Sequence, residues 1–260
     1  MISNAKSTNQ SLAKEERVMN EAIETLKKYF SEESNTIHFH GDNSFVTHFA
    51  EVLFEGISRE YEAPDLYIKY GNELWIIEHF EFDCFKSSRK GSTYKREQSR
   101  INKIEENIKP TKEGVVFHNT IDANSSYNDY VNNVAKIFNS HYQKIEKYKS
   151  NLINDKVADE NTRFITLFLI DDVSPLGSSY VDEQGKWRAI ILAHSKEFLN
   201  LLRESPLLNG VLAVSCCSKE KFIWFIDGKQ IDEYYLNAED YSNCKFMNFK
   251  PHIVGFKIEL

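Results

Sequence analysis

The chain has 260 residues and a formal net charge of −7 at pH 7, with 41% hydrophobic and 27% charged residues. A chain of this length and composition can bury one substantial core, which excludes the collagen-like, coiled-coil and disordered classes. The acidic total argues against a protein that coats DNA through its overall charge, although it leaves room for a local basic groove.

The N-terminal segment and the cysteines predict a reduced, cytoplasmic protein that does not span a membrane. Residues 1–12 are rich in Ser, Asn and Gln and lack the apolar segment of a signal peptide, so we expect a disordered tail there. The sequence contains no run of about 18 apolar residues. The four cysteines have no CxxC spacing, which excludes a zinc ribbon and a thiol redox motif.

Taken in chain order, the hydrophobic pattern first predicts two helices and then three strands. Apolar residues recur at helical spacing in residues 14–30, and a second helix runs from Asn43 or Ser44 to about Glu55. The strands are expected at 57–61, 66–70 and 74–82. Gly71-Asn72 between the last two strands is a hairpin signal.

The rest of the chain predicts helices alternating with short apolar strands. Helices are expected at 92–108, 127–148 and 195–202, and strands at 164–170, 211–215 and 222–226. Residues 115–121 fit either a short strand or a loop, and 252–258 could form a last strand in an otherwise irregular tail. This order predicts the α/β (α+β) class, with a mixed central sheet flanked by helices. We expect residues 13–260 to form a single domain, with its core at about 40–227 and a helical insertion at about 110–155.

Carboxylates gather around the predicted hairpin. Asp65 opens one strand and Glu78 lies in the next, so an antiparallel pairing brings the two side chains close together on one face. The preceding helix supplies Glu51 and Glu55 on one face, with His48 one turn earlier. Convergent carboxylates suit Mg²⁺, which can activate water and stabilise a leaving oxygen in phosphodiester cleavage.

This arrangement resembles the PD-(D/E)xK nuclease superfamily, which has a restriction-endonuclease-like core of a helix, a three-stranded meander, a helix and further strands. Pro64-Asp65 would match the PD half, Glu78 the second acid, and Glu51 or its runner-up Glu55 the acid on the helix. The resemblance covers about residues 40–110 by motif and extends to about 227 by element order. It implies a metal-dependent nuclease in defence, repair or mobile-element biology, with Mg²⁺ or Mn²⁺ held by Glu51, Asp65 and Glu78.

The chain departs from the family at the lysine that polarises the attacking water. That lysine would stand two residues after Glu78, where this sequence has Phe80. A displaced lysine is the preferred explanation, with Lys69 and Lys95 as equal candidates. The other lysines that follow the strand are Lys86 and Lys90. Alternatively, Glu81 or Asp83 is the true acid in a different register, or the domain binds nucleic acid without cleaving it.

A basic segment follows the motif directly. Its basic residues are Lys86, Arg89, Lys90, Lys95, Arg96, Arg100 and Lys103. Seven positive charges against Glu97 give a local charge of +6. Such a run predicts either binding to a nucleic-acid backbone, with DNA preferred to RNA, or an ordinary solvated helix face of a structural or partner-binding protein. Gln98 shares a helical side with Lys95 and is expected beside the acids. Many nucleases pair to cut two strands, so the resemblance leaves a homodimer open beside a monomer.

Two further patterns remain open between a site and ordinary structure. His38 and His40 share a strand face and could form half of a zinc site, but a third ligand is not evident. Asp171-Asp172 ends an apolar strand, where acids either gather at a site or simply terminate the strand.

Overall fold

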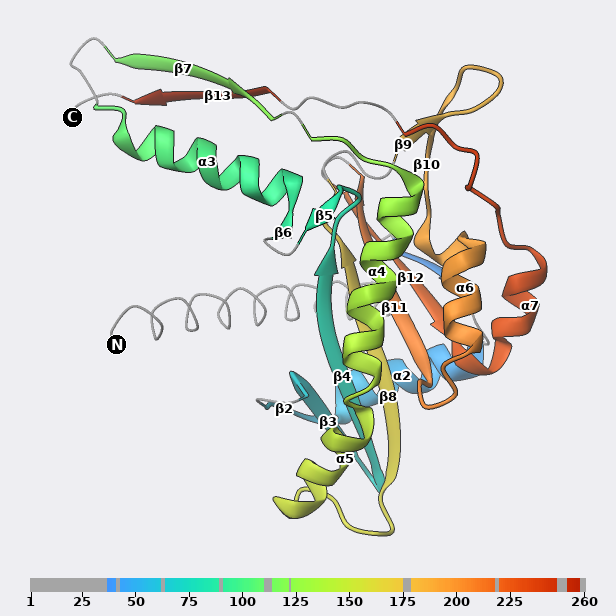
Figure 1. Ribbon diagram of the computed structural model, residues 1–260. Helices are drawn as coiled ribbons and strands as arrows, with labels where there is room; N and C mark the ends of the chain where they lie inside the picture. Colours follow the sequence, from blue (N-terminus) through green and yellow to red (C-terminus); the bar gives the residue numbers. More distant parts are fainter. Residues whose placement is uncertain are drawn as a thin grey trace.

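The structure, a computed structural model, describes residues 37–40, 43–61, 64–88, 91–109, 114–121, 123–174, 179–217, 220–246 and 252–257 (Figure 1). The expected tail at 1–12 and the expected helix at 14–30 lie outside these residues. The described chain is mixed α/β with a central sheet, which confirms the expected class at that level.

Seven strands form the central sheet: β1 (Ile37–His40), β2 (Ile57–Glu60), β3 (Leu66–Tyr70), β4 (Glu73–Phe82), β8 (Arg163–Asp172), β11 (Gly210–Cys217) and β12 (Glu220–Asp227). The helices are α2 (Asn43–Glu55), α3 (Thr93–Asn107), α4 (Tyr127–Tyr142), α5 (Ile145–Asn154), α6 (Lys196–Arg203) and α7 (Ile231–Leu236). Three strand pairs stand outside the sheet: β5 (Ser87–Ser88) with β6 (Gly91–Ser92), β7 (Val115–Thr120) with β13 (His252–Lys257), and β9 (Ser179–Val181) with β10 (Trp187–Ala189). Each strand expected from the sequence is found, within a few residues of its predicted bounds.

The sheet has the spatial order β1-β12-β11-β8-β4-β3-β2. β2, β3 and β4 form an antiparallel meander, whereas β4, β8 and β11 run parallel to one another. Parallel strands finish at the same edge of a sheet. We call this the carboxyl edge, formed by residues 81–83 at the end of β4 and 171–172 at the end of β8.

One face of the sheet is covered by α2. Strand side chains alternate between faces, and the odd-numbered residues of β4 point toward α2. Trp75 packs against Phe49 of α2 with ring centroids 5.3 Å apart, and Phe49 also stacks on Phe225 of β12 at 5.8 Å. All three rings are buried, and each such burial stabilises the fold by about 1.5–3 kcal/mol.

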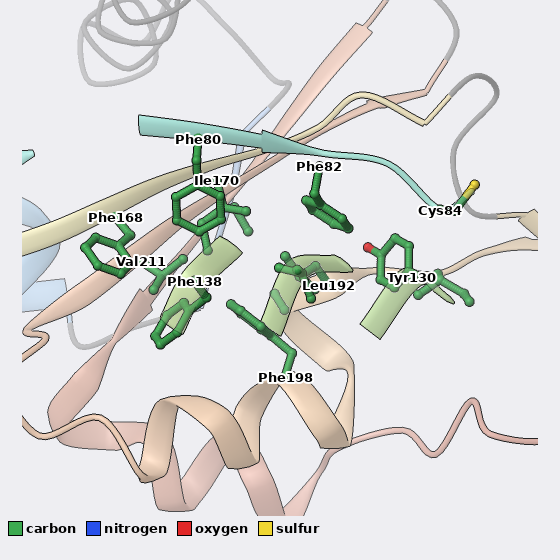
Figure 2. Close-up of a cluster of buried hydrophobic side chains, with 14 of the residues drawn as sticks. Phe80, Phe82, Cys84, Tyr130, Phe138, Phe168, Ile170, Leu192, Phe198 and Val211 are labelled. Carbon is green, nitrogen blue, oxygen red and sulfur yellow. The ribbon is translucent and has the colours of Figure 1, made fainter. Parts of the chain in front are cut away.

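The opposite face is covered by α4, α5 and α6. Figure 2 shows Phe80 and Phe82 pointing from β4 toward Phe138 of α4 and Phe198 of α6. Phe138 meets Phe168 of β8 edge to face, with centroids 5.2 Å apart. Although α4 and α5 fall within the range expected as a helical insertion, they pack directly on the sheet.

The single helix expected at 127–148 is wrong, because the chain forms two helices with a break at Gln143–Lys144. The break lets the second helix follow the sheet. Tyr148 and Leu152 of α5 pack against Leu74 and Ile76 in the first half of β4, whereas α4 covers its second half.

α3 and the β7–β13 ribbon project from the carboxyl edge, away from the sheet (Figure 1). β7 and β13 pair antiparallel along their full lengths, from Val115 beside Lys257 to Thr120 beside His252. Ile101 is the one residue of α3 that is fully buried, so most of this helix faces solvent.

Candidate functional site

Asp65 and Glu78 come together as the hairpin spacing predicts. Leu66 pairs with Ile77, which places Asp65 opposite Glu78 across the two strands. The backbone N–H of Asp65 donates to Oε2 of Glu78 at 3.3 Å, and Oδ2 of Asp65 accepts from the backbone N–H of His79 at 2.8 Å. The two carboxylates are therefore held by backbone donors of each other's strand.

Glu78 is enclosed by the two helices that cover its face. Its Oε1 accepts a hydrogen bond from the Tyr148 hydroxyl of α5 at 2.7 Å and lies 2.6 Å from Nδ1 of His141 in α4. Only 5% of Glu78 is exposed. Burial, together with the hydrogen bond to Glu78, raises the pKa of Tyr148. The carboxylate thus joins the end of α4 to the start of α5, a structural role that explains a glutamate in an apolar strand.

Phe80, which stands where the resemblance to PD-(D/E)xK nucleases predicts a lysine, belongs to the core. Its ring stacks on His141 with centroids 5.0 Å apart and meets Phe168 edge to face at 5.8 Å. Together with Tyr148, these rings fill the space beside Glu78, so aromatic groups stand where a lysine ammonium was expected.

The expected metal set of Glu51, Asp65 and Glu78 is not assembled. α2 lies on the opposite face of the sheet from Glu78, and Glu51 points to His48, whose Nδ1 lies 3.3 Å from its Oε2. Glu55 accepts instead from the Tyr70 hydroxyl at 3.3 Å. Across the described ranges of the chain, no group of three or more His, Cys, Asp and Glu residues is placed to hold a metal ion.

His48 belongs to a separate cluster at the start of β4. Its Nε2 lies 2.7 Å from Oε2 of buried Glu73, which also accepts from Trp75 Nε1 at 3.0 Å and from Arg163 Nη1 at 2.8 Å. Burial lowers the pKa of His48, but the hydrogen bonds to Glu73 and Glu51 outweigh burial and raise the pKa above 6.5. The cluster fastens α2 to the sheet and lies about five residues, or roughly 16 Å, from Glu78 along β4.

The two candidate lysines lie apart, and neither contacts Glu78. Nζ of Lys69 donates to the backbone carbonyl of Val157 at 3.3 Å, beyond α5. Nζ of Lys95 lies 3.9 Å from Oε2 of Glu81, at the carboxyl edge. Lys86 is exposed ahead of α3, and Arg89 and Lys90 lie outside the described residues.

The carboxyl edge brings Glu81 beside Asp171. The two residues are register partners on parallel strands, and alternation points both toward the face that α2 covers further down the strands. Asp171 is buried and Glu81 is half-buried. Asp83 and Asp172 instead stabilise the loops that follow their strands. Asp83 accepts from the backbone N–H of Phe85 at 3.1 Å, and Asp172 accepts from that of Ser174 at 2.9 Å.

Ser92 fixes the start of α3 above the end of β4. Its hydroxyl donates to Oδ2 of Asp83 at 2.7 Å and accepts from the backbone N–H of Lys95 at 3.2 Å, so one side chain both caps the helix and anchors it. Asn133 of α4 donates to the backbone carbonyls of Asp83 and Phe85, both at 2.8 Å. The position of Lys95 next to Glu81 follows from these bonds.

Basic side chains form one exposed stripe along α3. At 3.6 residues per turn, they lie on the side opposite buried Ile101. We call Lys95, Arg96, Arg100 and Lys103 the α3 stripe. Arg100 is also bound to Glu97 through a 3.0 Å ion pair. Gln98 lies off the stripe and donates to Asn102 at 2.8 Å, so it does not join the acids.

Sequence patterns did not identify His141 and Tyr148 as partners of Glu78. The two residues are seven positions apart across a helix break, and only packing of both helices on β4 brings them to one carboxylate. The pairing of Asp171 with Glu81 was equally hidden, because it depends on the register of two parallel strands. The one sequence pattern that pointed to this pair was the position of Asp171 at the end of an apolar strand.

Within the described ranges, no helix combines the length and the apolar composition needed to cross a bilayer. No family model matches the chain. No curated protein and no solved structure matches it either. Neither a family nor a relative therefore assigns a role to the carboxyl edge, to the Asp65–Glu78 pair or to the α3 stripe.

Proposed function

We propose that this chain is a metal-dependent nuclease that hydrolyses phosphodiester bonds at the carboxyl edge. Glu81 and Asp171 would hold the metal, Lys95 would face the scissile phosphate, and the α3 stripe would bind the flanking backbone. The observation that carries the proposal is the 3.9 Å contact of Lys95 with Glu81, the register neighbour of Asp171. Two acids and a lysine are the residue types of a PD-(D/E)xK site. Here the acid on β4 is Glu81, three positions after the Glu78 of the sequence motif.

The order of elements supports a restriction-endonuclease-like core. Helix α2 precedes the β2–β3–β4 meander, and helices then lead to β8, which pairs parallel with β4. Ligands of open α/β sheets bind outside the carboxyl ends of parallel strands, which is where Glu81 and Asp171 lie. This likeness concerns the arrangement of elements and does not by itself establish an activity.

Glu81 and Asp171 fit a divalent metal better than Asp65 and Glu78 do. Mg²⁺ prefers carboxylate oxygens and keeps several waters, so two neighbouring acids are enough. Glu78 is only 5% exposed and is enclosed by α4 and α5, where it bonds to His141 and Tyr148, whereas Glu81 is half-buried at the edge of the sheet beside Lys95. A bound ion supplies Lewis-acid activation of water and of the phosphate.

Lys95 and the α3 stripe supply the rest of the chemistry from this chain's own residues. Hydrolysis forms a bond from a water oxygen to phosphorus and breaks the bond to one sugar oxygen, while negative charge grows on the phosphate. An ammonium held beside the acids stabilises that charge without reorganising. Arg96, Arg100 and Lys103 continue the positive charge along the helix and would neutralise neighbouring phosphates.

The test is a cleavage assay on labelled DNA and RNA, single- and double-stranded, with Mg²⁺ or Mn²⁺. We expect Glu81→Gln, Asp171→Asn and Lys95→Met each to lower the rate at least about a hundredfold. Lys69→Met is the matched control, because it removes an exposed lysine on the same sheet far from the carboxyl edge. Cleavage that persists in Glu81→Gln and Asp171→Asn would overturn the assignment of the site. Preference for DNA and a homodimer in sedimentation are further predictions of the proposal.

A second candidate is a protein of the same fold that binds nucleic acid without cleaving it. It is favoured by Phe80, because an aromatic stack on His141 stands where the resemblance to PD-(D/E)xK nucleases predicts a lysine. In this case the wild-type chain binds nucleic acid with strong salt dependence and does not cleave it, whichever divalent ion is added. The α3 stripe variants then lower affinity, whereas Glu81→Gln does not.

A further inference from the structure

A cavity of about 660 Å³ lies between the β9–β10 hairpin and the segment at 239–241. The side chains that matter here are Tyr180, Asp182, Trp187, Arg188, Glu239 and Tyr241. Small-molecule sites occupy about 300–1,000 Å³, combine aromatic walls with a few polar groups and suit ligands of nucleotide size. Neither the proposed hydrolysis nor the α3 stripe uses any of these residues.

Three aromatic side chains form the walls. Tyr241 is 2% exposed, and its ring meets that of Tyr180 at 65° with centroids 5.9 Å apart. Trp187, by contrast, is 62% exposed, so its indole contributes little to the core. An exposed tryptophan beside a cavity with rigid aromatic walls presents a flat surface on which another ring can stack.

The polar groups of the cavity are held in place. Asp182 accepts from the backbone N–H groups of Lys186 at 2.8 Å and Gln184 at 3.0 Å, and from Nε of Arg188 at 3.0 Å. These bonds orient the guanidinium, whose terminal nitrogens remain as donors. The backbone of Glu239 is fixed by bonds with Lys196 and His194. Its side chain is 54% exposed, and its Oε1 lies 3.7 Å from Nδ1 of His194.

The charges favour a base over a phosphate. Two carboxylates and one guanidinium give the cavity a net charge of −1, which repels a phosphate group. A nucleobase is neutral and flat. It carries ring nitrogens and carbonyls that accept from Arg188, and several bases carry an amino group that donates to Glu239.

We propose that this cavity binds an unpaired nucleobase stacked on Trp187, with Arg188 donating to the base and Glu239 accepting from its amino group. The inference that the base belongs to a nucleic-acid strand rests on the proposed function. The inference that the cavity binds a base does not.

The cavity stands at the same end of the sheet as the carboxyl edge. Tyr241 belongs to the hydrophobic cluster that contains Phe82 and Phe85, at the end of β4, and Tyr180 packs against that cluster. β9 begins seven residues after β8 ends at Asp172. The β9–β10 hairpin, which lines the cavity, and α3 therefore lie toward one end of the described molecule (Figure 1).

The test uses Trp187 as its own reporter. Of the three tryptophans, Trp75 is fully buried and Trp224 is half-buried, so Trp187 dominates the response to an added ligand. We expect quenching of tryptophan fluorescence by dAMP, dCMP and dGMP, weaker quenching by dTMP, and no quenching by inorganic phosphate. Glu239→Gln should remove the difference between dCMP and dTMP. The absence of quenching by every nucleotide, or equal quenching in Trp187→Phe, would overturn the proposal.

Anisotropy of a labelled single strand and of the matching duplex identifies the source of the base. Trp187→Ala should weaken single-strand binding about fivefold or more and leave duplex binding unchanged, because stacking needs an unpaired base. The indole is exposed, so a thermal unfolding curve should confirm that the variant folds. Quenching by mononucleotides with unchanged single-strand binding in Trp187→Ala would identify a site for free nucleotides.

The α3 stripe separates this proposal from the proposed function. Arg96→Glu should weaken binding of the single strand and of the duplex alike. If Arg96→Glu and Lys95→Met leave binding and cleavage unchanged while mononucleotides still quench Trp187, the base site stands and the nuclease proposal fails. If the stripe variants lose binding but Trp187→Ala matches wild type in nucleotide quenching and in single-strand anisotropy, the base site is overturned and the nuclease proposal stands.

Discussion

The imidazole of His141 lies nearly parallel to the ring of Phe80, with 5.0 Å between centroids and 18° between planes. The same imidazole reaches Glu78 with its Nδ1 at 2.6 Å. One side chain thus covers an apolar ring and partners a buried carboxylate at the place where the resemblance to PD-(D/E)xK proteins predicts a lysine and an acid. The stack fills the site that the sequence motif predicts, which is why we propose that the chemistry lies at Glu81.

Phe80→Lys restores the family pattern in sequence but should not restore a site. The substitution removes a ring that is 5% exposed and buries an ammonium against Phe168, so we expect it to lower the free energy of unfolding by at least about 3 kcal/mol. Phe80→Leu should cost less than about 1.5 kcal/mol. Urea unfolding measures both. A stable Phe80→Lys protein with increased cleavage would show that the Glu78 site is the functional one.

Tyr148→Phe should destabilise the fold by about 1–3 kcal/mol, because it leaves the enclosed Glu78 carboxylate without one of its donors. Tyr70→Phe is the matched control. Its hydroxyl donates at 3.3 Å to the exposed Glu55, and its removal should change stability by less than about 0.5 kcal/mol. Chemical denaturation compares the two. Equal effects would mean that Tyr148 does not stabilise the junction of α4 and α5 through Glu78.

His48 should make stability depend on pH. The hydrogen bonds to Glu73 and Glu51 raise its pKa above 6.5, so its protonated form is favoured in the folded state. The resulting stabilisation is fully present below pH 6.5 and is lost as the pH rises through the folded pKa. The difference in unfolding free energy between wild type and His48→Gln should therefore shrink as the pH rises through this window. A difference that stays constant or grows contradicts the assignment.

Ser92→Ala should weaken nucleic-acid binding without changing any charge. It removes the cap of α3 and its bond to Asp83, at a cost of about 0.5–2 kcal/mol. Ser126→Ala is the matched control, because Ser126 caps α4 in the same way, accepting from Asp129 N–H at 3.0 Å. Both variants should lose similar stability, but only Ser92→Ala should lose affinity in a filter-binding assay. Equal affinities would show that the placement of α3 does not matter for binding.

Charge reversal on the α3 stripe should change the salt dependence of binding. Each phosphate contact contributes about 0.9 to the slope of log K against log salt on duplex DNA. Arg96→Glu should therefore reduce the slope by about 1 or more, because a contact is lost and a repulsive charge is added. Lys147→Glu on α5 is the control, since Lys147 is equally exposed but lies off the stripe. Identical slopes for the two variants would remove α3 from the interface.

Short-range patterns in the sequence predicted most of the helices and strands and one side-chain pair. Alternation and turn residues predict the β2–β3–β4 meander, and the length of the hairpin places Asp65 beside Glu78. Helical periodicity predicts α3 and the side of the helix on which its basic residues lie, and the structure adds Ser92 as its cap. These features depend on neighbours within about twenty residues, so local physics is sufficient to predict them.

Only the tertiary structure decided which groups meet across the sheet. α2 packs on the face opposite Glu78, so Glu51 cannot join the predicted metal set, and a sequence pattern does not reveal which face a helix covers. The parallel register of β4 and β8 sets Glu81 beside Asp171 across about ninety residues of chain. Ser92, anchored on Asp83, then brings Lys95 to Glu81. The net charge of −7 thus averages a basic segment at residues 86–103 with an acidic remainder, and the positions of these charges, which only folding fixes, determine the electrostatics of the site.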